Sequence, residues 1–150
     1  MSMVFRVYAA SGRFMTRPEK FALGDFLLQA IRGEPVRVRS PHPVIRSYVN
    51  VEQMMRLAWR LLSESQPQYG YSCVDACTHT VTLTALASMV AGAFAADCSL
   101  PDEATKLLSV IDRYTGDQDF YIGLSSGFGI SVVDLEQQIR DTALGLKRKA

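Results

Sequence analysis

The 150-residue sequence has no long apolar run, only three cysteines and almost no net charge. No run approaches the ~20 apolar residues of a membrane-spanning helix, so we expect no membrane partner. A formal net charge of +1 provides no overall field that would attract nucleic acid, so we expect no nucleic-acid partner either. An odd number of cysteines without a signal-peptide pattern favours reduced thiols in the cytoplasm.

Reactive clusters are equally scarce. Cys73, Cys77 and His79 are close enough in sequence to suggest zinc, but Cys-x3-Cys-x-His lacks a separated second pair of ligands, so we predict no metal site. The two histidines fit no evident nucleophilic arrangement with a serine and an acid, although spacing alone does not decide this point. We therefore predict no catalytic residue in this chain.

The sequence has enough hydrophobic residues to form the core of a globular domain. Hydrophobic residues make up 48% of the chain and charged residues 21%, which is typical of a globular protein. The length is that of one domain and is sufficient to bury a sizeable core. We expect residues 1–150 to form a single domain.

The stretch from Gly33 to Gln53 gives the clearest structural pattern. Gly33 is suited to the position after a helix, and the alternation of Val36 to Arg39 predicts a strand. A turn at 40–43 and a second strand follow. Asn50 is then predicted to cap a helix, with Gln53 at the spacing of a reciprocal capping pair.

Four helices are predicted from apolar spacing, around several short strands, which makes the fold class α/β. They run up to Gly33, from about residue 51 to 64, from about 82 to 96, and from near Ser131 to the C-terminus. A short helix within residues 101–112 is compatible with the sequence. We assign no structure to residues 121–129. The inward positions of the last helix are predicted to be Leu135, Ile139, Ala143 and Leu146.

Two segments in this order resemble a known family. One is the Gly33-Glu34-Pro35 turn, which is followed by a strand and by Arg46-x-Tyr48-Val49-x-Val51; the other is Arg113-x-x-Gly116-Asp117. Together they resemble the C-terminal, substrate-binding half of the extended short-chain dehydrogenase/reductases, the NAD-dependent nucleotide-sugar epimerases and dehydratases. The resemblance covers nearly the whole chain, and the shared order of the segments is its main support.

The resemblance implies a set of substrate-binding residues. Arg46 and Arg113 would bind the substrate diphosphate, for which arginine supplies a permanent charge and forked donors. Asp117 would accept a hydrogen bond from the nucleotide ribose. Lys20, just before a helix start, is a weaker candidate for phosphate binding. On spacing alone, a single arginine such as Arg46 is more often a solvated strand residue than a ligand-binding one.

The catalytic part of that family is missing from this sequence. No glycine-rich turn follows an opening strand, and neither Tyr48 nor Tyr114 has a lysine four residues later, so there is no Tyr-x-x-x-Lys pair. We therefore expect that this chain alone binds no cofactor, although the resemblance implies NAD for the complete enzyme. A separate NAD-binding domain or a second copy of the chain, in a homo-oligomer, are the protein partners that the resemblance allows.

The expected function is the nucleotide-sugar-binding part of an NAD-dependent epimerase or dehydratase of polysaccharide metabolism, cytoplasmic and not catalytic alone. A truncated or split product of a longer enzyme would have this sequence. The alternative is a non-catalytic interaction or oligomerisation module derived from the same lobe. The first hypothesis requires Arg46 and Arg113 to meet at one pocket, whereas the second does not.

Overall fold

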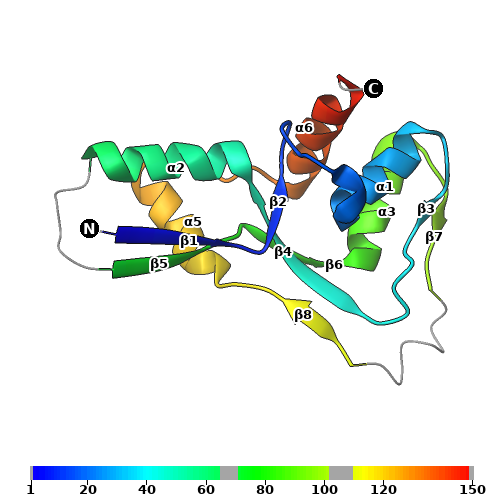
Figure 1. Ribbon diagram of the computed structural model, residues 1–150, viewed down its shortest axis with the longest axis horizontal. Helices are drawn as coiled ribbons and strands as arrows, with labels where there is room; N and C mark the ends of the chain where they lie inside the picture. The colour runs from blue at the N-terminus through cyan, green and yellow to red at the C-terminus, as the bar shows by residue number, and fades with distance from the viewer. Residues whose placement is uncertain (1, 65–70, 102–109, 149–150) are drawn as a thin grey trace.

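A computed structural model describes residues 2–64, 71–101 and 110–148 of the chain (Figure 1). Its strands form three groups. The first is a parallel pair of β1 (Ser2–Val7) and β5 (Tyr71–Ala76). The second is a sheet in the order β2 (Ala9–Ser11), β4 (Val44–Asn50), β6 (His79–Thr82), with β8 (Asp112–Tyr114) also paired to β4. The third is a short parallel pair of β3 (Val36–Arg37) and β7 (Cys98–Ser99).

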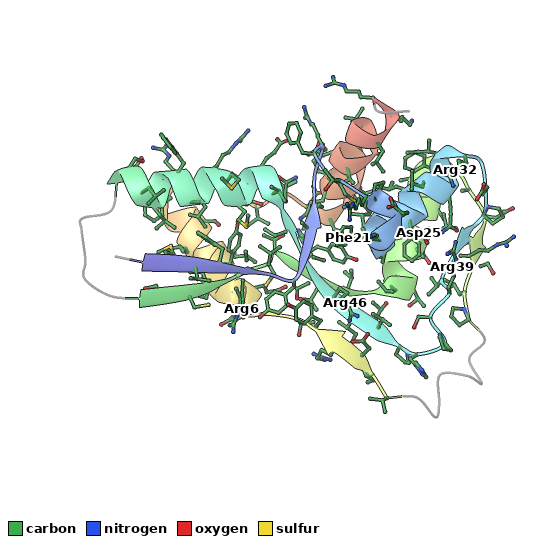
Figure 2. All side chains as sticks on the ribbon, viewed as in Figure 1. Arg6, Phe21, Asp25, Arg32, Arg39 and Arg46 are labelled. Atoms are coloured by element: carbon green, nitrogen blue, oxygen red, sulfur yellow. The ribbon has the colours of Figure 1, made fainter. Side chains whose placement is uncertain are left out.

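The described helices fall into two packing groups. A short 3₁₀ helix, η1 (Pro18–Lys20), leads into α1 (Ala22–Ile31), which packs with α3 (Leu83–Phe94) and α6 (Leu135–Lys147) at one end of the molecule. At the other end, α2 (Val51–Glu64) and α5 (Gln118–Gly127) pack around the β1–β5 pair. Figure 2 shows Arg6 beside that pair and Arg46 on β4, which runs between the two ends.

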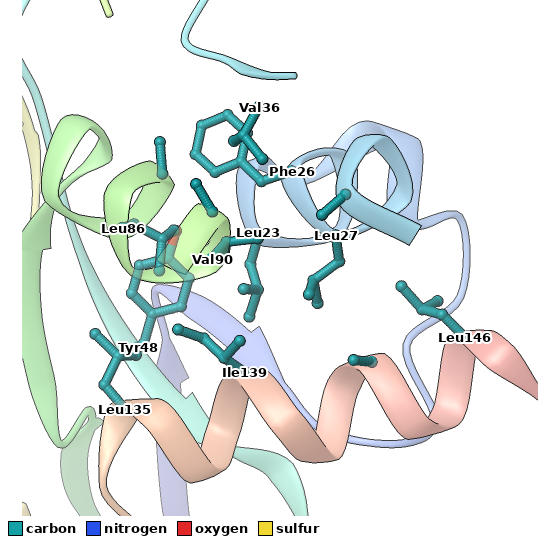
Figure 3. Packing of buried hydrophobic residues seen from close by; sticks show 14 residues of the cluster. Leu23, Phe26, Leu27, Val36, Tyr48, Leu86, Val90, Leu135, Ile139 and Leu146 are labelled. Atoms are coloured by element: carbon teal, nitrogen blue, oxygen red, sulfur yellow. The ribbon is translucent and has the colours of Figure 1, made fainter. Parts of the chain in front are cut away.

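Each end has its own hydrophobic core. The α1–α3–α6 core includes Leu23, Leu27, Leu86 and Ile139, all at most 1% exposed (Figure 3). The second core joins Val49 of β4 to α2, β5 and α5 through Leu57, Val74 and Tyr121. Because β4 contributes Tyr48 to the first core and Val49 to the second, this strand is held on both faces.

Several predicted features are confirmed. The helix that begins at residue 51 ends at Glu64, and the Asn50 side chain accepts from the Gln53 backbone N–H at 3.0 Å. Gly33 has a φ of 73°, the left-handed conformation expected just after α1. The predicted inward positions of the last helix are all buried: Leu135, Ile139, Ala143 and Leu146.

Other predictions are wrong for identifiable reasons. The last helix begins at Leu135 because Asp134, rather than Ser131, caps it by accepting from the Gln137 N–H at 2.7 Å. Within 121–129, where no structure was assigned, the structure has α5, which Asp117 caps. The Gln53 side chain does not complete a reciprocal cap but bonds to the α5–α6 loop. The short helix considered within 101–112 lies mainly outside the described residues.

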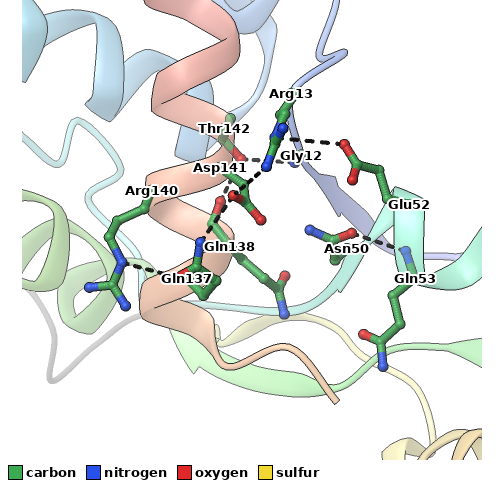
Figure 4. Close-up of polar contacts among 10 residues, drawn as sticks. All are labelled: Gly12, Arg13, Asn50, Glu52, Gln53, Gln137, Gln138, Arg140, Asp141 and Thr142. Atoms are coloured by element: carbon green, nitrogen blue, oxygen red, sulfur yellow. Dashed lines mark hydrogen bonds and ion pairs between the residues drawn. The ribbon is translucent and has the colours of Figure 1, made fainter. Parts of the chain in front are cut away.

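A buried polar network fixes α6 to the sheet, and Figure 4 shows its members Gln138 and Thr142 on α6 and Gly12 after β2. The Gln138 side chain accepts from Ser11 Oγ at 2.7 Å and donates to Thr78 Oγ1 at 3.0 Å. Thr142 Oγ1 accepts from the Gly12 N–H at 2.8 Å. Because these groups are withdrawn from water and paired with one another, they specify one position for α6 over β2 and β4.

Candidate functional site

The candidate site lies where β4 and β8 run side by side. The parallel register pairs Ile45 with Arg113 and Arg46 with Tyr114. Paired residues share a face of a sheet and successive residues alternate between faces. The register therefore places Arg46 with Tyr114, while Arg113 lies on the opposite face with Ile45.

Arg46 is held in a fixed, forked geometry. Its two terminal nitrogens donate to the two carboxylate oxygens of Asp112 at 3.0 and 2.6 Å, and one of them also donates to the Asp112 carbonyl oxygen at 3.1 Å. The Arg46 side chain is 25% exposed and that of Asp112 is 56% exposed. The hydrogen bonds from Arg46 lower the pKa of the Asp112 carboxyl below its ordinary value, so it is ionised at neutral pH.

Arg113 is placed differently. It is exposed on β8, and its side chain makes no hydrogen bond or ion pair with any residue in the described part of the chain. The two arginines are thus on neighbouring strands, but the register places them on opposite faces, so the described structure does not bring them to one pocket as the nucleotide-sugar hypothesis requires. β8 pairs only with β4 among the described strands, so Arg113 lies on an edge strand of the described sheet.

Asp117 and Lys20 occupy distinct positions. Asp117 caps α5: its Oδ1 accepts from the backbone N–H of Asp119 at 3.0 Å and, more weakly, from that of Phe120 at 3.4 Å. Its second carboxylate oxygen makes no hydrogen bond with a described residue, and the side chain is exposed. Lys20 ends η1, is exposed, and has no side-chain partner among the described residues.

A group of residues that the sequence did not indicate surrounds Asp75. Arg6, in register with it on β1, donates from Nε to Asp75 Oδ1 at 2.7 Å, and the Asp117 backbone N–H donates to Oδ2 at 3.1 Å. The Tyr8 ring lies beside the same cluster, with its centroid 4.7 Å from that of Tyr114. The Asp75 carboxylate thus links the ends of β1 and β5 to the turn between β8 and α5.

The charge on Asp75 follows from these contacts. Burial raises the pKa of the Asp75 carboxyl, but the hydrogen bonds from the Asp117 N–H and Arg6, together with the neighbouring Tyr8, lower it more, so the pKa is below its ordinary value. Burial raises the pKa of the Tyr8 phenol, which stays protonated at neutral pH. The cluster is therefore an ionised carboxylate surrounded by donors.

The position of Gly116, in the turn between β8 and α5 beside Tyr8 and Asp75, leaves no room for a side chain. A Cβ atom at this position would lie 2.4 Å from Tyr8 Cε2 and 2.8 Å from Asp75 Cβ. The Gly116 N–H also donates to Ser47 Oγ at 3.3 Å. The sequence signal for this site was the Gly116-Asp117 pair, but the partners Arg6 and Asp75 come from strands whose pairing the sequence does not specify.

Other features of the surface lie apart from the arginines. A groove of about 1160 Å³ runs between α2 and the α5–α6 loop, lined in part by Trp59, Arg56 and Phe128, and neither Arg46 nor Arg113 lines it. No group of three or more His, Cys, Asp or Glu side chains suited to a metal occurs within residues 2–64, 71–101 and 110–148. In the same ranges, none of the helices has the length and apolar character needed to span a bilayer.

Comparisons with known proteins agree on the architecture. The fold is similar to UDP-glucuronic acid 4-epimerase from Bacillus cereus, solved with UDP-glucuronic acid and NAD (TM-score 0.71, 11% identity), covering 99% of this chain and 46% of that one. It is similar to UDP-glucose 4-epimerase from Thermus thermophilus, solved with NAD (TM-score 0.70, 17% identity; 99% and 47% covered). It is also similar to dTDP-glucose 4,6-dehydratase from Bacillus anthracis, solved with NAD (TM-score 0.68, 12% identity; 97% and 44% covered).

The chain has the fold of an extended short-chain dehydrogenase/reductase lobe. It spans slightly less than half the length of these solved chains, in agreement with the predicted C-terminal half. At identities of 11–17% the likeness shows the fold rather than the activity. No protein-family model matches the sequence, and no curated protein matches it.

Proposed function

We propose that this chain is the nucleotide-sugar-binding part of an NAD-dependent epimerase or dehydratase, and that Arg46 binds the diphosphate. The observation that carries the proposal is the forked guanidinium of Arg46, which is fixed on β4 and already binds an oxyanion, the Asp112 carboxylate, with two parallel hydrogen bonds. Phosphate oxygens suit the same bidentate geometry. The ligand class of the proposal is supported by similar structures that were solved with UDP-sugars.

The proposal also assigns a role to each remaining candidate residue. Arg113 would reach the same diphosphate around the edge of β8, since its side chain is exposed and makes no contact that holds it elsewhere among the described residues. Asp117 would accept a ribose hydroxyl at its second oxygen while the first continues to cap α5. Lys20 would contribute a phosphate contact from η1, before the start of α1.

The chemistry itself requires a part that this chain does not provide. The fold here corresponds to less than half of the similar enzymes, and the sequence contains no dinucleotide-binding turn. We infer that NAD is held by a separate NAD-binding domain, which would supply hydride transfer, and that this lobe does not catalyse alone. Polysaccharide metabolism in the cytoplasm is the setting that this proposal implies.

One observation favours the alternative of an interaction or oligomerisation module. The α2 helix carries three large apolar side chains that are well exposed, including Trp59 at 72% and Leu62 at 81%, together with Met55. On β1, Val4 and Val7 are also more than a third exposed. Exposed apolar surface of this extent is typical of a face that another protein surface covers.

Calorimetric titration of the purified chain with UDP-, dTDP-, CDP- and GDP-sugars tests the proposal. We expect saturable binding by the wild-type chain and a loss of about tenfold or more on Arg46→Ala, since a charge-assisted bidentate contact is removed. Arg113→Ala should weaken binding less, because its side chain starts from the opposite face. Arg60→Ala on α2 is a matched control that should leave binding unchanged. Binding that is insensitive to Arg46 would contradict the proposed site, and absence of binding by a folded chain would favour the interaction module.

A further inference from the structure

The two ion pairs near the candidate site differ in how firmly the acid is held. Asp75 is 13% exposed, and its carboxylate accepts from Arg6 and from the Asp117 backbone N–H. Asp112 is 56% exposed, and among the described residues only Arg46 donates hydrogen bonds to its carboxylate. Asp75 is therefore part of the framework, whereas the Asp112 side chain can turn into water and, among the described residues, break only the bonds with Arg46.

The backbone of Asp112 stays fixed when its side chain leaves. Its N–H donates to the Pro43 carbonyl at 2.9 Å, and β8 remains paired with β4 from Val44 to Arg46. The carbonyl of Asp112 also accepts from Arg46 at 3.1 Å, which keeps the guanidinium in place. Rotation of one side chain would thus expose a preformed forked donor.

We propose that Asp112 acts as an internal competitor for the anion site of Arg46, occupying the guanidinium in the free chain and being displaced when a diphosphate binds. This inference rests on the proposed function and adds a specificity-determining residue to it. A carboxylate carries one charge, whereas a nucleoside diphosphate carries more than one and offers more acceptor oxygens, so a diphosphate exchanges with Asp112 more favourably than a singly charged anion does.

Replacing the competitor separates this role from a structural one. Asp112→Asn removes the charge but keeps the size of the side chain and the backbone contacts. We expect the dissociation constant for UDP to fall by roughly fivefold, the scale of one well-formed exposed ion pair. Asp119→Asn is the matched control: it removes the same charge from an exposed position in the first turn of α5, close in sequence to Asp117, where the carboxylate pairs with no described residue.

The experiment is a titration of UDP into the wild-type chain and both variants at one ionic strength, with circular dichroism to establish that all three are folded. Tighter binding by Asp112→Asn with little change in Asp119→Asn supports the proposal. Equal tightening in both variants overturns it, because any nearby negative charge would then suffice. Unchanged or weaker binding by Asp112→Asn, while the wild-type chain binds, overturns it and leaves the proposed function standing. Absence of binding by all three chains overturns both.

Discussion

At the residue scale, the organisation of the candidate site depends on acids that fix the positions of cations. Asp75 joins Arg6, Tyr8 and the start of α5 in one cluster, and Asp112 orients the guanidinium of Arg46. The two acids have different tasks because their surroundings differ. Asp75 is mostly enclosed and accepts from Arg6 on β1 and from the Asp117 N–H before α5, so its removal breaks a link between these two segments.

Asp75→Asn is expected to destabilise the chain by about 1 kcal/mol at pH 7, because it removes the charge that accepts from Arg6 and from the Asp117 N–H, and water can still reach both donors. The pKa of Asp75 is lower in the folded chain than in the unfolded one, so its stabilisation is present above the unfolded pKa of about 4 and is lost as the pH falls through the folded pKa. Urea unfolding at several pH values should show that the difference in free energy of unfolding between wild type and Asp75→Asn becomes smaller at acid pH. A difference that does not depend on pH would contradict this assignment.

Gly116→Ala should be costly, because the added Cβ would lie within 2.4 Å of the Tyr8 ring. Displacement of Tyr8 or of the turn is expected to cost about 2 kcal/mol. The matched control is Gly123→Ala within α5, where nothing lies within 4 Å of the new Cβ and helix propensity favours alanine. Thermal unfolding of both variants compares them directly; equal stability of the two would show that the turn has room to adjust.

At the element scale, α6 is positioned by polar as well as apolar contacts. Gln138 is fully buried and links Ser11 of β2, Thr78 and the Val133 carbonyl. Gln138→Ala removes these bonds and leaves a cavity, so we expect a loss of about 3 kcal/mol in the free energy of unfolding. Glu136→Ala, on the exposed side of the same helix, should change it by less than about 0.5 kcal/mol. Chemical denaturation measures the free energy of unfolding of both variants. Equal losses in Gln138→Ala and Glu136→Ala would contradict a stabilising role of the buried network.

Helix positions were predictable to the extent that local signals determine them. Asn50 marks the start of α2 and Gly33 follows the end of α1, because capping depends on the type of residue at the helix end and on its near neighbours in sequence. The start of α6 was misplaced because Ser131 and Asp134 are both suitable caps, and packing of the α5–α6 loop against Gln53 decides between them. The helix α5 was missed because its apolar pattern is weak and Asp117 supplies its main start signal.

The site was less predictable than the helices, for a reason that lies in strand register. The segments containing Arg46 and Arg113 were recognised in the sequence, but a shift of one residue in the pairing of β4 with β8 exchanges the faces of Arg113 and Tyr114. The Arg6–Asp75 and Arg46–Asp112 pairs likewise depend on parallel pairing between distant segments. No local pattern in the sequence fixes either register.

At the scale of the whole molecule, two packed ends share the central strand β4, and the fold corresponds to less than half of the solved enzymes that resemble it. The proposed function therefore predicts that the chain alone has little affinity for NAD while it retains affinity for nucleotide-sugars. Titration of NAD and of UDP-glucose into the same sample tests this. Tight NAD binding by this chain would require a dinucleotide site that its sequence does not indicate.

The central claim is that a diphosphate binds at the β4–β8 surface beside Arg46. The most direct measurement is a series of ¹H–¹⁵N correlation spectra of the labelled chain during titration with UDP-glucose. We predict saturable shifts that are concentrated at Arg46, at residues 112–117 and at the neighbouring Tyr8, and that are absent in Arg46→Ala. Shifts confined to α2 and its groove, or no shifts at millimolar ligand, would contradict the claim.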